Sequence, residues 1–127
     1  MESNMGFILI DDNLIDQFVI KKILKKVLDI NLLYIANNGK EGLDWLLKNA
    51  RQKPLVIFLD IQMPIMNGFE FLDQFQNLEE EVKDKIQIFV LSSTLDLDEI
   101  KKVKENKYVS GFWNKPLQIE LLKNKFS

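Results

Sequence analysis

Side chains able to handle a phosphoryl group or a hard metal ion follow short apolar runs at four points in this sequence. Asp11-Asp12 comes after the first run, Asp60 after the third, Ser92-Ser93 after the fourth and Asn114-Lys115-Pro116 after the fifth. The chain has no His and no Cys, so any metal would be held by oxygen ligands, which suit Mg²⁺. A lysine and a hydroxyl beside such a metal neutralise and position an anion. The set therefore indicates phosphoryl transfer, where catalysis is mostly positioning and charge neutralisation.

A carboxylate can itself accept the phosphoryl group. Asp60 is the best candidate because it stands alone after the most apolar run, whereas Asp11-Asp12 is paired as a metal clamp requires. Acids after strands also cap helices, and Asp11-Asp12 taken alone fits that explanation equally well. A helix cap needs no lysine or hydroxyl on the same rim, so the presence of Ser92 and Lys115 favours a functional site.

Composition limits the other possibilities. With 127 residues the chain is predicted to be one domain, residues 1–127, without a separate output domain. Seventeen basic against nineteen acidic residues give a net charge of −2, which argues against direct nucleic-acid binding. The lack of Cys and His excludes disulfides, thiol chemistry and Ser-His-Asp catalysis. No basic leader or membrane-length apolar run is found, so we expect a cytoplasmic protein with no membrane partner.

Strand and helix patterns alternate along the chain. Short apolar runs predict strands at Phe7 to Ile10, Leu32 to Ala36, Leu55 to Leu59, Ile86 to Leu91 and Val109 to Trp113. Helical patterns occupy Leu14 to Leu28, Gly39 to Ala50, a segment starting near Gly68, Leu97 to Asn106 and Leu117 to Phe126, with a charged connector from Glu79 to Lys85. The continuous apolar strands predict a parallel sheet covered on both faces, and the alternation predicts a doubly wound α/β fold. Ligands of such sheets bind beyond the carboxyl ends of the strands, where the polar residues lie.

The helical periodicity also predicts which residues face the core. The inward set includes Leu14, Phe18, Ile20, Ile23, Leu24, Val27 and Leu28 in the first helix, Leu43, Leu46 and Leu47 in the second, and Phe71, Leu72, Phe75 and Leu78 in the third. The helix from Leu97 has few apolar positions besides Ile100 and Val103, and the last helix buries Leu121, Leu122 or Phe126. Lys21, Lys22, Lys25 and Lys26 are interpreted as a solvated helix face, Trp45 as a packing residue and Asn13 as an N-cap.

Taken together, these motifs resemble the receiver domain of two-component response regulators over essentially the whole chain. The resemblance rests on Asp11-Asp12, on the stretch from Asp60 to Gly68 (DIQMPIMNG) and on Asn114-Lys115-Pro116. It implies a flavodoxin-like (βα)5 three-layer sandwich with five parallel strands in the order 2-1-3-4-5. It also implies a chemotaxis-type, single-domain phosphoprotein that assists its own phosphorylation and dephosphorylation without being an enzyme in the ordinary sense.

The resemblance assigns roles to individual residues. Asp60 matches the phosphoacceptor and Asp12 a direct Mg²⁺ ligand, while Asp11 matches the acid that holds metal-bound water and Gln62 offers its backbone carbonyl. Lys115 matches the lysine that pairs first with the acceptor and then with the phosphoryl group. Ser92 matches the switch hydroxyl, Ser93 the small residue beside it and Phe112 the aromatic switch position. Gln62 and Thr94 are expected to tune dephosphorylation by flanking the path of the attacking water.

Three finer expectations concern the loops. The commonest family spacing before Lys115 falls on Ser93, but we prefer Ser92 because it follows the apolar run directly, and place the extra residue around Asn106 to Tyr108. Gly68, and to a lesser degree Asn67, is expected to adopt a backbone conformation that other residues resist. The Lys115-Pro116 bond is expected to be cis, as in the resembling family. Trp113 should point away from Phe112 in a regular strand.

The expected partners are a histidine kinase or histidine phosphotransfer protein as donor and a downstream protein as target. The target surface is predicted on the fourth predicted helix, the fifth strand and the fifth helix, using Lys101, Lys104, Tyr108 and Trp113. Two alternatives are a receiver-like docking module that is never phosphorylated and, less favoured, a phosphatase with an aspartyl-phosphate intermediate. The latter usually needs a second acid two residues after the nucleophile, where this chain has Gln62.

Overall fold

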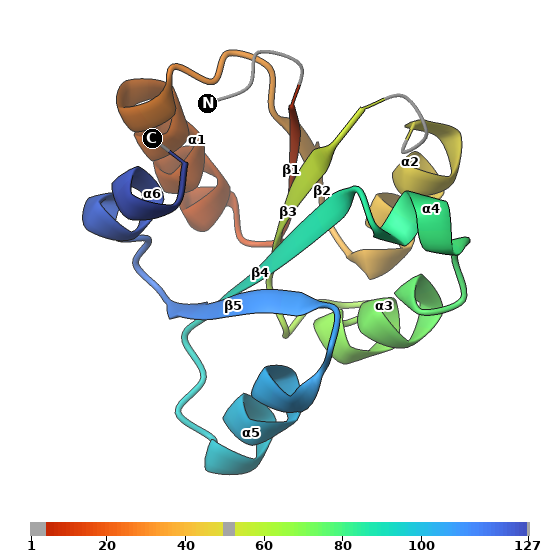
Figure 1. Ribbon diagram of the computed structural model, residues 1–127. Coiled ribbons are helices and arrows are strands. Elements are labelled where there is room, and N and C mark those ends of the chain that lie inside the picture. Colours follow the sequence, from red (N-terminus) through yellow and green to blue (C-terminus); the bar gives the residue numbers. More distant parts are fainter. Residues whose placement is uncertain (1–4, 50–52, 127) are drawn as a thin grey trace.

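The computed structural model describes residues 5–49 and 53–126 and contains one parallel sheet with the strand order β2-β1-β3-β4-β5 (Figure 1). The strands are β1 (Gly6–Ile10), β2 (Tyr34–Ala36), β3 (Leu55–Leu59), β4 (Ile86–Ser92) and β5 (Val109–Asn114). The predicted fold and strand order are thus confirmed. The edge strand β2 is shorter than predicted, because pairing with β1 begins only at Tyr34 and Leu32 is left 89% exposed.

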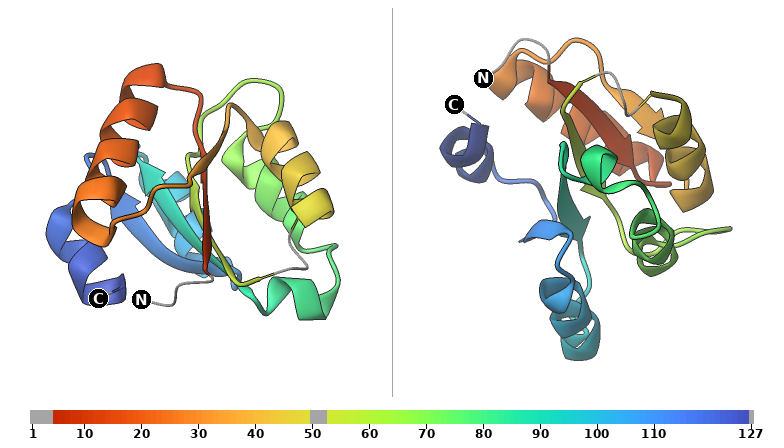
Figure 2. Two further views of the ribbon diagram at one scale, coloured as in Figure 1. Left: turned by 90° about the horizontal axis from the view of Figure 1, so that it is seen from above. Right: turned by 45° about the vertical axis from the view of Figure 1, so that its right-hand side comes forward.

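Helices cover both faces of the sheet (Figure 2). They are α1 (Leu14–Leu28), α2 (Gly39–Asn49), α3 (Gly68–Phe75), α4 (Glu80–Lys83), α5 (Leu97–Glu105) and α6 (Ile119–Phe126). The single turn α4 lies in the segment predicted as a charged connector, where Val82 and Lys83 are buried. The fourth and fifth predicted helices therefore correspond to α5 and α6. Residue 50, predicted as the end of the second helix, lies outside the described residues.

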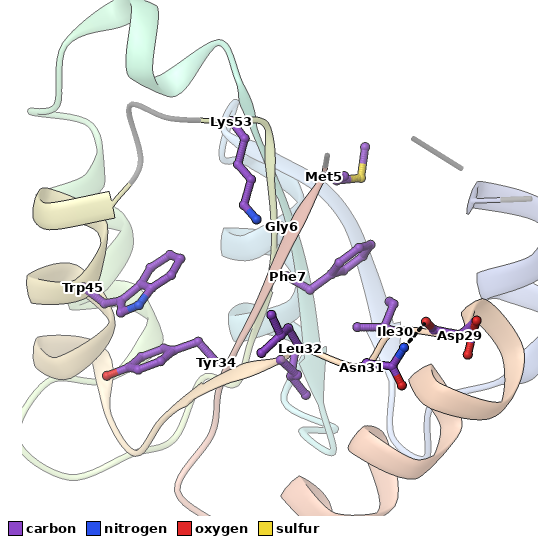
Figure 3. A pocket seen from close by; sticks show the side chains of 11 residues that line it. Met5, Gly6, Phe7, Asp29, Ile30, Asn31, Leu32, Tyr34, Trp45 and Lys53 are labelled. Carbon is purple, nitrogen blue, oxygen red and sulfur yellow. Dashed lines mark hydrogen bonds between the residues drawn. The ribbon is translucent and has the colours of Figure 1, made fainter. Parts of the chain in front are cut away.

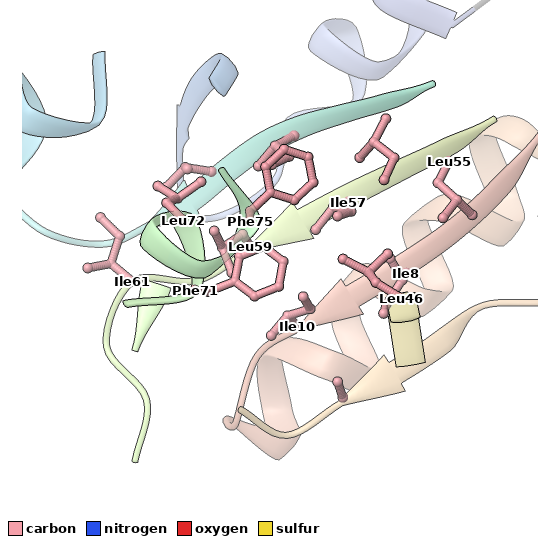
Figure 4. Packing of buried hydrophobic residues seen from close by; sticks show 14 of the residues in the cluster. Ile8, Ile10, Leu46, Leu55, Ile57, Leu59, Ile61, Phe71, Leu72 and Phe75 are labelled. Carbon is pink, nitrogen blue, oxygen red and sulfur yellow. The ribbon is translucent and has the colours of Figure 1, made fainter. Parts of the chain in front are cut away.

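Two apolar clusters fill the layers on either side of the sheet. Ile8, Ile57 and Leu59 face the helices α2, α3 and α5, where Phe71 and Phe75 are fully buried (Figure 4). The alternate strand residues, among them Leu9, Val56 and Phe58, pack with α1 and α6 on the other face. Because successive strand residues point to opposite faces, runs that are apolar throughout are what two covered faces require.

Several residues predicted to face the core are exposed instead. Leu14 is 75%, Phe18 61% and Leu47 62% exposed. The buried stripe of α1 is centred on Ile20 and Leu24, and Phe18 lies about 200° around the helix from Ile20. Leu47 is similarly about 100° from its buried neighbour in α2. The helical pattern was right, but the buried stripe is narrower than the apolar one.

Other expectations about these helices are confirmed. Lys21, Lys22, Lys25 and Lys26 are all exposed, as a solvated helix face requires. Asn13 caps α1, since its side chain accepts a hydrogen bond from the Asp16 N–H at 2.9 Å. Trp45 packs as predicted, with its ring stacked on Tyr34 at 5.0 Å between centroids.

Candidate functional site

The predicted polar residues meet at the carboxyl ends of the strands. There they line a hollow of about 230 Å³ formed by Asp12, Asn13, Asp16, Asp60, Gln62, Ser92, Ser93, Thr94 and Lys115. Each of β1, β3, β4 and β5 ends in one of the polar segments that sequence reasoning selected. Parallel strands present their carboxyl ends on the same side of the sheet, which is why Asp11 and Lys115, 104 positions apart, can meet.

Three carboxylates form the acidic part of this site. One oxygen each from Asp11, Asp12 and Asp60 lies within 4.8 Å of the others. Asp11 is fully buried and Asp60 is 9% exposed, whereas Asp12 is open to solvent. Three converging carboxylates repel one another unless a cation joins them, and hard oxygen donors suit Mg²⁺. The donor set therefore fits a magnesium ion.

Main-chain hydrogen bonds hold the two buried acids in place. The Asn13 N–H donates to Asp11 Oδ1 at 2.9 Å, and the Ile61 N–H donates to Asp60 Oδ1 at 2.8 Å. The Asp60 N–H in turn donates to the Ile10 carbonyl at 2.9 Å, which continues the β1–β3 ladder up to the site. The second carboxylate oxygen of Asp60 is directed at Lys115.

The environment of Asp60 disfavours its charged form. Burial raises the pKa of Asp60 from 3.8 to about 6, against the lowering effect of Lys115 and with a further raising effect from Asp11. When Asp60 is ionised, its carboxylate is more basic than that of an exposed aspartate, because burial disfavours the charged form. Perturbed groups of this kind are common at functional sites. A bound cation would favour the charged form and lower this pKa again.

Lys115 sits at the centre of the acids. Its Nζ is 2.8 Å from Asp11 Oδ2, 2.8 Å from Asp16 Oδ2 and 3.5 Å from Asp60 Oδ2. Burial of the ammonium lowers the Lys115 pKa, but the hydrogen bonds to Asp11 and Asp16 outweigh burial and leave the pKa raised. The Lys115-Pro116 bond is cis, as expected.

Asp16 is a site residue that sequence reasoning missed. Its position in the first turn of α1 was explained fully by capping and the helix dipole, so nothing marked it as a neighbour of Lys115. The available signal was its spacing: one helical turn after Asp12, a first-turn side chain lies over the same rim as the preceding loop.

Ser92, rather than Ser93, occupies the end of β4. Ser92 is 3% exposed and its carbonyl accepts a hydrogen bond from the Lys115 N–H at 3.0 Å, while Ser93 is exposed. Ser92 Oγ accepts from the Thr94 N–H at 3.1 Å, and Thr94 Oγ1 donates to Glu99 at 2.6 Å. A chain of hydrogen bonds therefore runs from the site to the first turn of α5.

The strand β5 contains an irregularity before Lys115. Ile88 pairs with Val109, but the next residue of β4 pairs with Gly111, so Ser110 is unmatched in a bulge. A strand can absorb one residue in a bulge while keeping its later register. The placement of an extra residue around Asn106 to Tyr108, relative to the commonest family spacing, stays a prediction.

The reason that we gave for a glycine at position 68, an unusual backbone conformation, was wrong. Gly68 has no positive φ; the residue with a left-handed conformation in this loop is Ile65, at φ 69°. A Cβ on Gly68 would lie 2.6 Å from the Asp60 carbonyl oxygen, so glycine is needed where α3 begins close to the Asp60 and Ile61 backbone. Asn67 has an ordinary φ of −82° and forms a capping box with Glu70.

The predicted aromatic switch residue Phe112 and the predicted readout residues are not among those that line the hollow. Phe112 is half-buried against the α3-side cluster, and Trp113 points to the other face, stacked on Phe89 at 4.7 Å, as predicted. Tyr108 is half-buried and its hydroxyl accepts a hydrogen bond from Lys83 at 3.1 Å. Lys101 and Lys104 are exposed on α5.

A second hollow, of about 460 Å³, lies near the amino ends of β1 and β2 (Figure 3). Its lining is largely apolar and includes Phe7, Leu32, Tyr34 and Trp45. It lies at the amino ends of the strands, whereas the acids lie at the carboxyl ends, and the described residues of its lining form no cluster of carboxylates. The converging acids and the lysine make the smaller hollow the candidate site for metal and phosphoryl chemistry.

Within the described residues, no helix is both long and apolar enough to span a membrane.

Comparison with known families agrees with this geometry. Residues 7–127 match the family model described as the response regulator receiver domain. The sensor histidine kinase CheAY of Helicobacter pylori is 35% identical over 113 residues, covering 89% of this chain and 13% of that protein. A protein-glutamate methylesterase/protein-glutamine glutaminase of Desulfotalea psychrophila is 32% identical over 77 residues, covering 61% of this chain. The chain spans only 20% of the latter relative's length.

Solved structures show the same fold. A two-component response regulator from Cytophaga hutchinsonii superimposes with a TM-score of 0.85 and 28% identity, covering 97% of this chain and 94% of that chain. A response regulator receiver protein from Dyadobacter fermentans gives a TM-score of 0.82 and 34% identity, covering 94% of this chain and 96% of that chain. Each superposition therefore covers at least 94% of this chain.

Proposed function

Because the chain belongs to the response regulator receiver family, we propose that it accepts a phosphoryl group on Asp60 from a phosphohistidine protein in a Mg²⁺-dependent reaction. The observation that carries the proposal is the Asp60 carboxylate itself. It is buried, has a pKa raised to about 6, and faces a buried ammonium 3.5 Å away beside two further acids. No helix-capping role explains that combination.

The transfer uses groups already in place. An Asp60 carboxylate oxygen attacks phosphorus, the bond from phosphorus to the donor imidazole nitrogen breaks, and the electron pair stays on that nitrogen, which takes up a proton. Lys115 donates to the phosphoryl oxygens and balances their charge. Asp12, Asp60 and the Gln62 backbone carbonyl would hold a Mg²⁺ ion with the help of Asp11, and the ion would neutralise charge on the phosphoryl oxygens.

Two residues of the hollow are placed to affect loss of the phosphoryl group. Gln62 and Thr94 both line the hollow that contains Asp60. Their bulk and polarity control where water can approach the acyl phosphate without touching the acceptor. We therefore assign them to the tuning of dephosphorylation.

An apolar collar around the hollow supports a protein donor. We define the collar as the exposed apolar side chains on the segments that follow β1, β3 and β4: Leu14, Ile15, Phe18, Ile65, Leu95 and Leu97. Their exposures run from 61% for Phe18 to 89% for Leu95. Clustered exposed apolar residues mark protein-binding surfaces, and a histidine kinase or phosphotransfer protein must bring its imidazole to this rim.

The signal leaves, in this proposal, through the face formed by α5, β5 and α6, which contacts a target protein. A Ser92 hydroxyl that turns toward the phosphoryl group releases the Thr94 N–H, and the half-buried Phe112 can move into the space left. α5 has only Val103 fully buried, which makes it the weakly anchored element. The exposed Lys101 and Lys104 then report the change to the partner.

The alternatives carry less support. A docking module that is never phosphorylated has no use for the raised pKa of Asp60 or for the buried lysine. A phosphatase would need a second acid near position 62, where the exposed Gln62 stands. In this proposal the chain is a signalling module that assists its own phosphorylation and dephosphorylation.

Intact mass measurement tests the proposal. The protein is incubated with a small phosphodonor, with and without Mg²⁺, alongside Asp60→Asn, Asp12→Ala and the control Asp98→Asn, which removes an exposed acid from α5. We expect one phosphoryl group on wild type and control in Mg²⁺, and none on either site variant. Equal labelling of Asp60→Asn and wild type would overturn the assignment.

The collar is tested separately. Phe18→Ser should slow transfer from a phosphohistidine protein while leaving labelling by the small phosphodonor unchanged, because only the protein donor contacts the collar. Lys48→Ser, an exposed residue of α2 outside the collar, is the control, because Lys22 lies over the Phe18 ring at 5.0 Å and is not independent of it. Equal loss with both donors would remove the collar from the proposal.

A further inference from the structure

The ammonium of Lys115 is bound more closely by Asp16 than by the phosphoacceptor. Its Nζ lies 2.8 Å from Asp16 Oδ2 and 3.5 Å from Asp60 Oδ2. The lysine side chain is 11% exposed, so it is confined among these acids rather than free in solvent. In the unphosphorylated molecule the positive charge is thus displaced from Asp60 toward α1.

Asp16 differs from the other acids around Lys115 in its freedom to move. Its backbone is anchored, because the Asp16 N–H donates to Asn13 Oδ1, but its side chain is 35% exposed. Asp11, the other close partner, is fully buried and also accepts a main-chain hydrogen bond. Asp16 can therefore release Lys115 and turn into water at little cost, whereas Asp11 cannot.

Asp16 also changes the charge balance of the site. The carboxylates of Asp11, Asp12 and Asp60 with Lys115 carry a net charge that one divalent cation cancels, and Asp16 adds a fourth carboxylate. An additional negative charge attracts a metal cation and repels a phosphoryl group. Its removal should therefore move the two affinities in opposite directions.

We infer that Asp16 is a positioning residue that holds Lys115 away from Asp60 and competes with the phosphoryl group for it, so that it sets how easily the receiver switches on. This inference rests on the proposed function of Asp60. Its consequence is that the receiver switches on less readily than one with a neutral side chain at position 16.

The experiment compares wild type with Asp16→Asn, Asp16→Glu and the control Asp98→Asn, which removes a first-turn carboxylate from α5. Mg²⁺ is titrated first, and beryllofluoride, a phosphoryl mimic, is then titrated at saturating Mg²⁺, with both followed by amide NMR. Phosphoryl half-life after labelling with a small phosphodonor is a third measurement. Circular dichroism checks that each variant is folded.

For Asp16→Asn we expect Mg²⁺ to bind about fivefold more weakly, and half-conversion to need about fivefold less beryllofluoride, as for a coupling at the low end of the usual range. The phosphoryl half-life should lengthen in the same proportion. Asp16→Glu and Asp98→Asn should resemble wild type.

Opposite shifts separate positioning from structural support. If Asp16 merely ties α1 to the end of β5, Asp16→Asn weakens both affinities together, and that outcome overturns the inference. Unchanged affinities overturn it as well. If wild type fails to bind beryllofluoride at all, the proposed function of Asp60 fails first, and the two failures are thereby distinguished.

Discussion

The raised pKa of Asp60 has a direct consequence for stability: Asp60→Asn should make the folded protein more stable at neutral pH. The carboxyl titrates at about 6 in the folded state, compared with 3.8 for an unperturbed group. Between these two values the folded state holds a proton that the unfolded state has released. Stability contributed by this group therefore falls as pH rises from about 4 through 6, and stays low at pH 7.

The structure bounds the size of this effect. Each pH unit between the two values is worth about 1.4 kcal/mol, so the difference between 3.8 and about 6 corresponds to at most about 3 kcal/mol. The Asp60 side chain is 12% exposed and faces an open hollow, so solvent reduces the free-energy cost of its buried charge. We expect a gain of about 1–2 kcal/mol for Asp60→Asn at pH 7.

Asparagine preserves the local contacts that matter. Its carbonyl oxygen can still accept the hydrogen bond that the Ile61 N–H donates to Asp60 Oδ1 at 2.8 Å. Lys115 keeps its two shorter partners, Asp11 and Asp16, when the 3.5 Å contact loses its charge. The substitution therefore isolates the cost of the buried carboxylate.

Urea denaturation at pH 4, 5, 6 and 7 without Mg²⁺ measures the difference in unfolding free energy between Asp60→Asn and wild type. The difference should be small near pH 4 and should grow to its full value by pH 7. Asp73→Asn, which changes an exposed acid on α3, should show no such growth. A difference that is absent, or that is the same at every pH, would refute the argument that burial destabilises the Asp60 carboxylate.

Magnesium provides the second arm of this experiment. A ligand that binds only the folded state stabilises it in proportion to the logarithm of its concentration over its dissociation constant. Wild type, with all three carboxylates, should gain more from Mg²⁺ than Asp60→Asn does. The advantage of the variant at pH 7 should therefore shrink or reverse as Mg²⁺ is added.

Three further predictions concern the switch. Lys115→Ala should fold and bind Mg²⁺ but lose most of the coupling between phosphorylation and partner binding, because no side-chain ammonium can then move toward the phosphoryl group. Partner-binding assays with and without beryllofluoride measure this coupling. Substituting Gln62 and Thr94 together should change the dephosphorylation rate by about tenfold but the phosphorylation rate little; equal effects on both argue against a role in water access. Ser92→Ala should leave phosphorylation of Asp60 intact but reduce the change in α5 that phosphorylation causes. Amide hydrogen exchange with and without beryllofluoride measures that change, and exchange differences confined to α1 and α2 would contradict the prediction.

Much of the fold was predictable from local patterns. The strands at Leu55–Leu59 and Ile86–Ser92 are apolar at nearly every position, and only a sheet covered on both faces buries such runs completely. The cap at Asn13 was also readable, because it depends on residues three positions apart. Boundaries were less predictable: β2 is shortened by where its partner β1 allows pairing to begin.

These features were hard to predict for one physical reason: a sequence pattern does not show which distant residues pack against a given side chain. Leu14 and Phe18 continue an apolar stripe, but whether a position is covered depends on what packs against α1, and both side chains are left exposed. The reason for Gly68 was misjudged because its crowding comes from the Asp60 carbonyl, eight residues earlier in sequence. The bulge at Ser110 depends on its partner strand β4.

The sequence by itself determined which chemical groups the molecule has, which segments form strands and helices, and that Asp12, Asp60, Ser92 and Lys115 end up on one rim. These follow from local propensity and from the rule that parallel strands share a carboxyl edge. The tertiary structure alone decided the pairings within that rim. Lys115 contacts Asp11 and Asp16 more closely than Asp60, and Asp60 has a pKa of about 6. Both facts depend on distances and burial between segments far apart in the chain, because electrostatic energies are set by separation and solvent exposure.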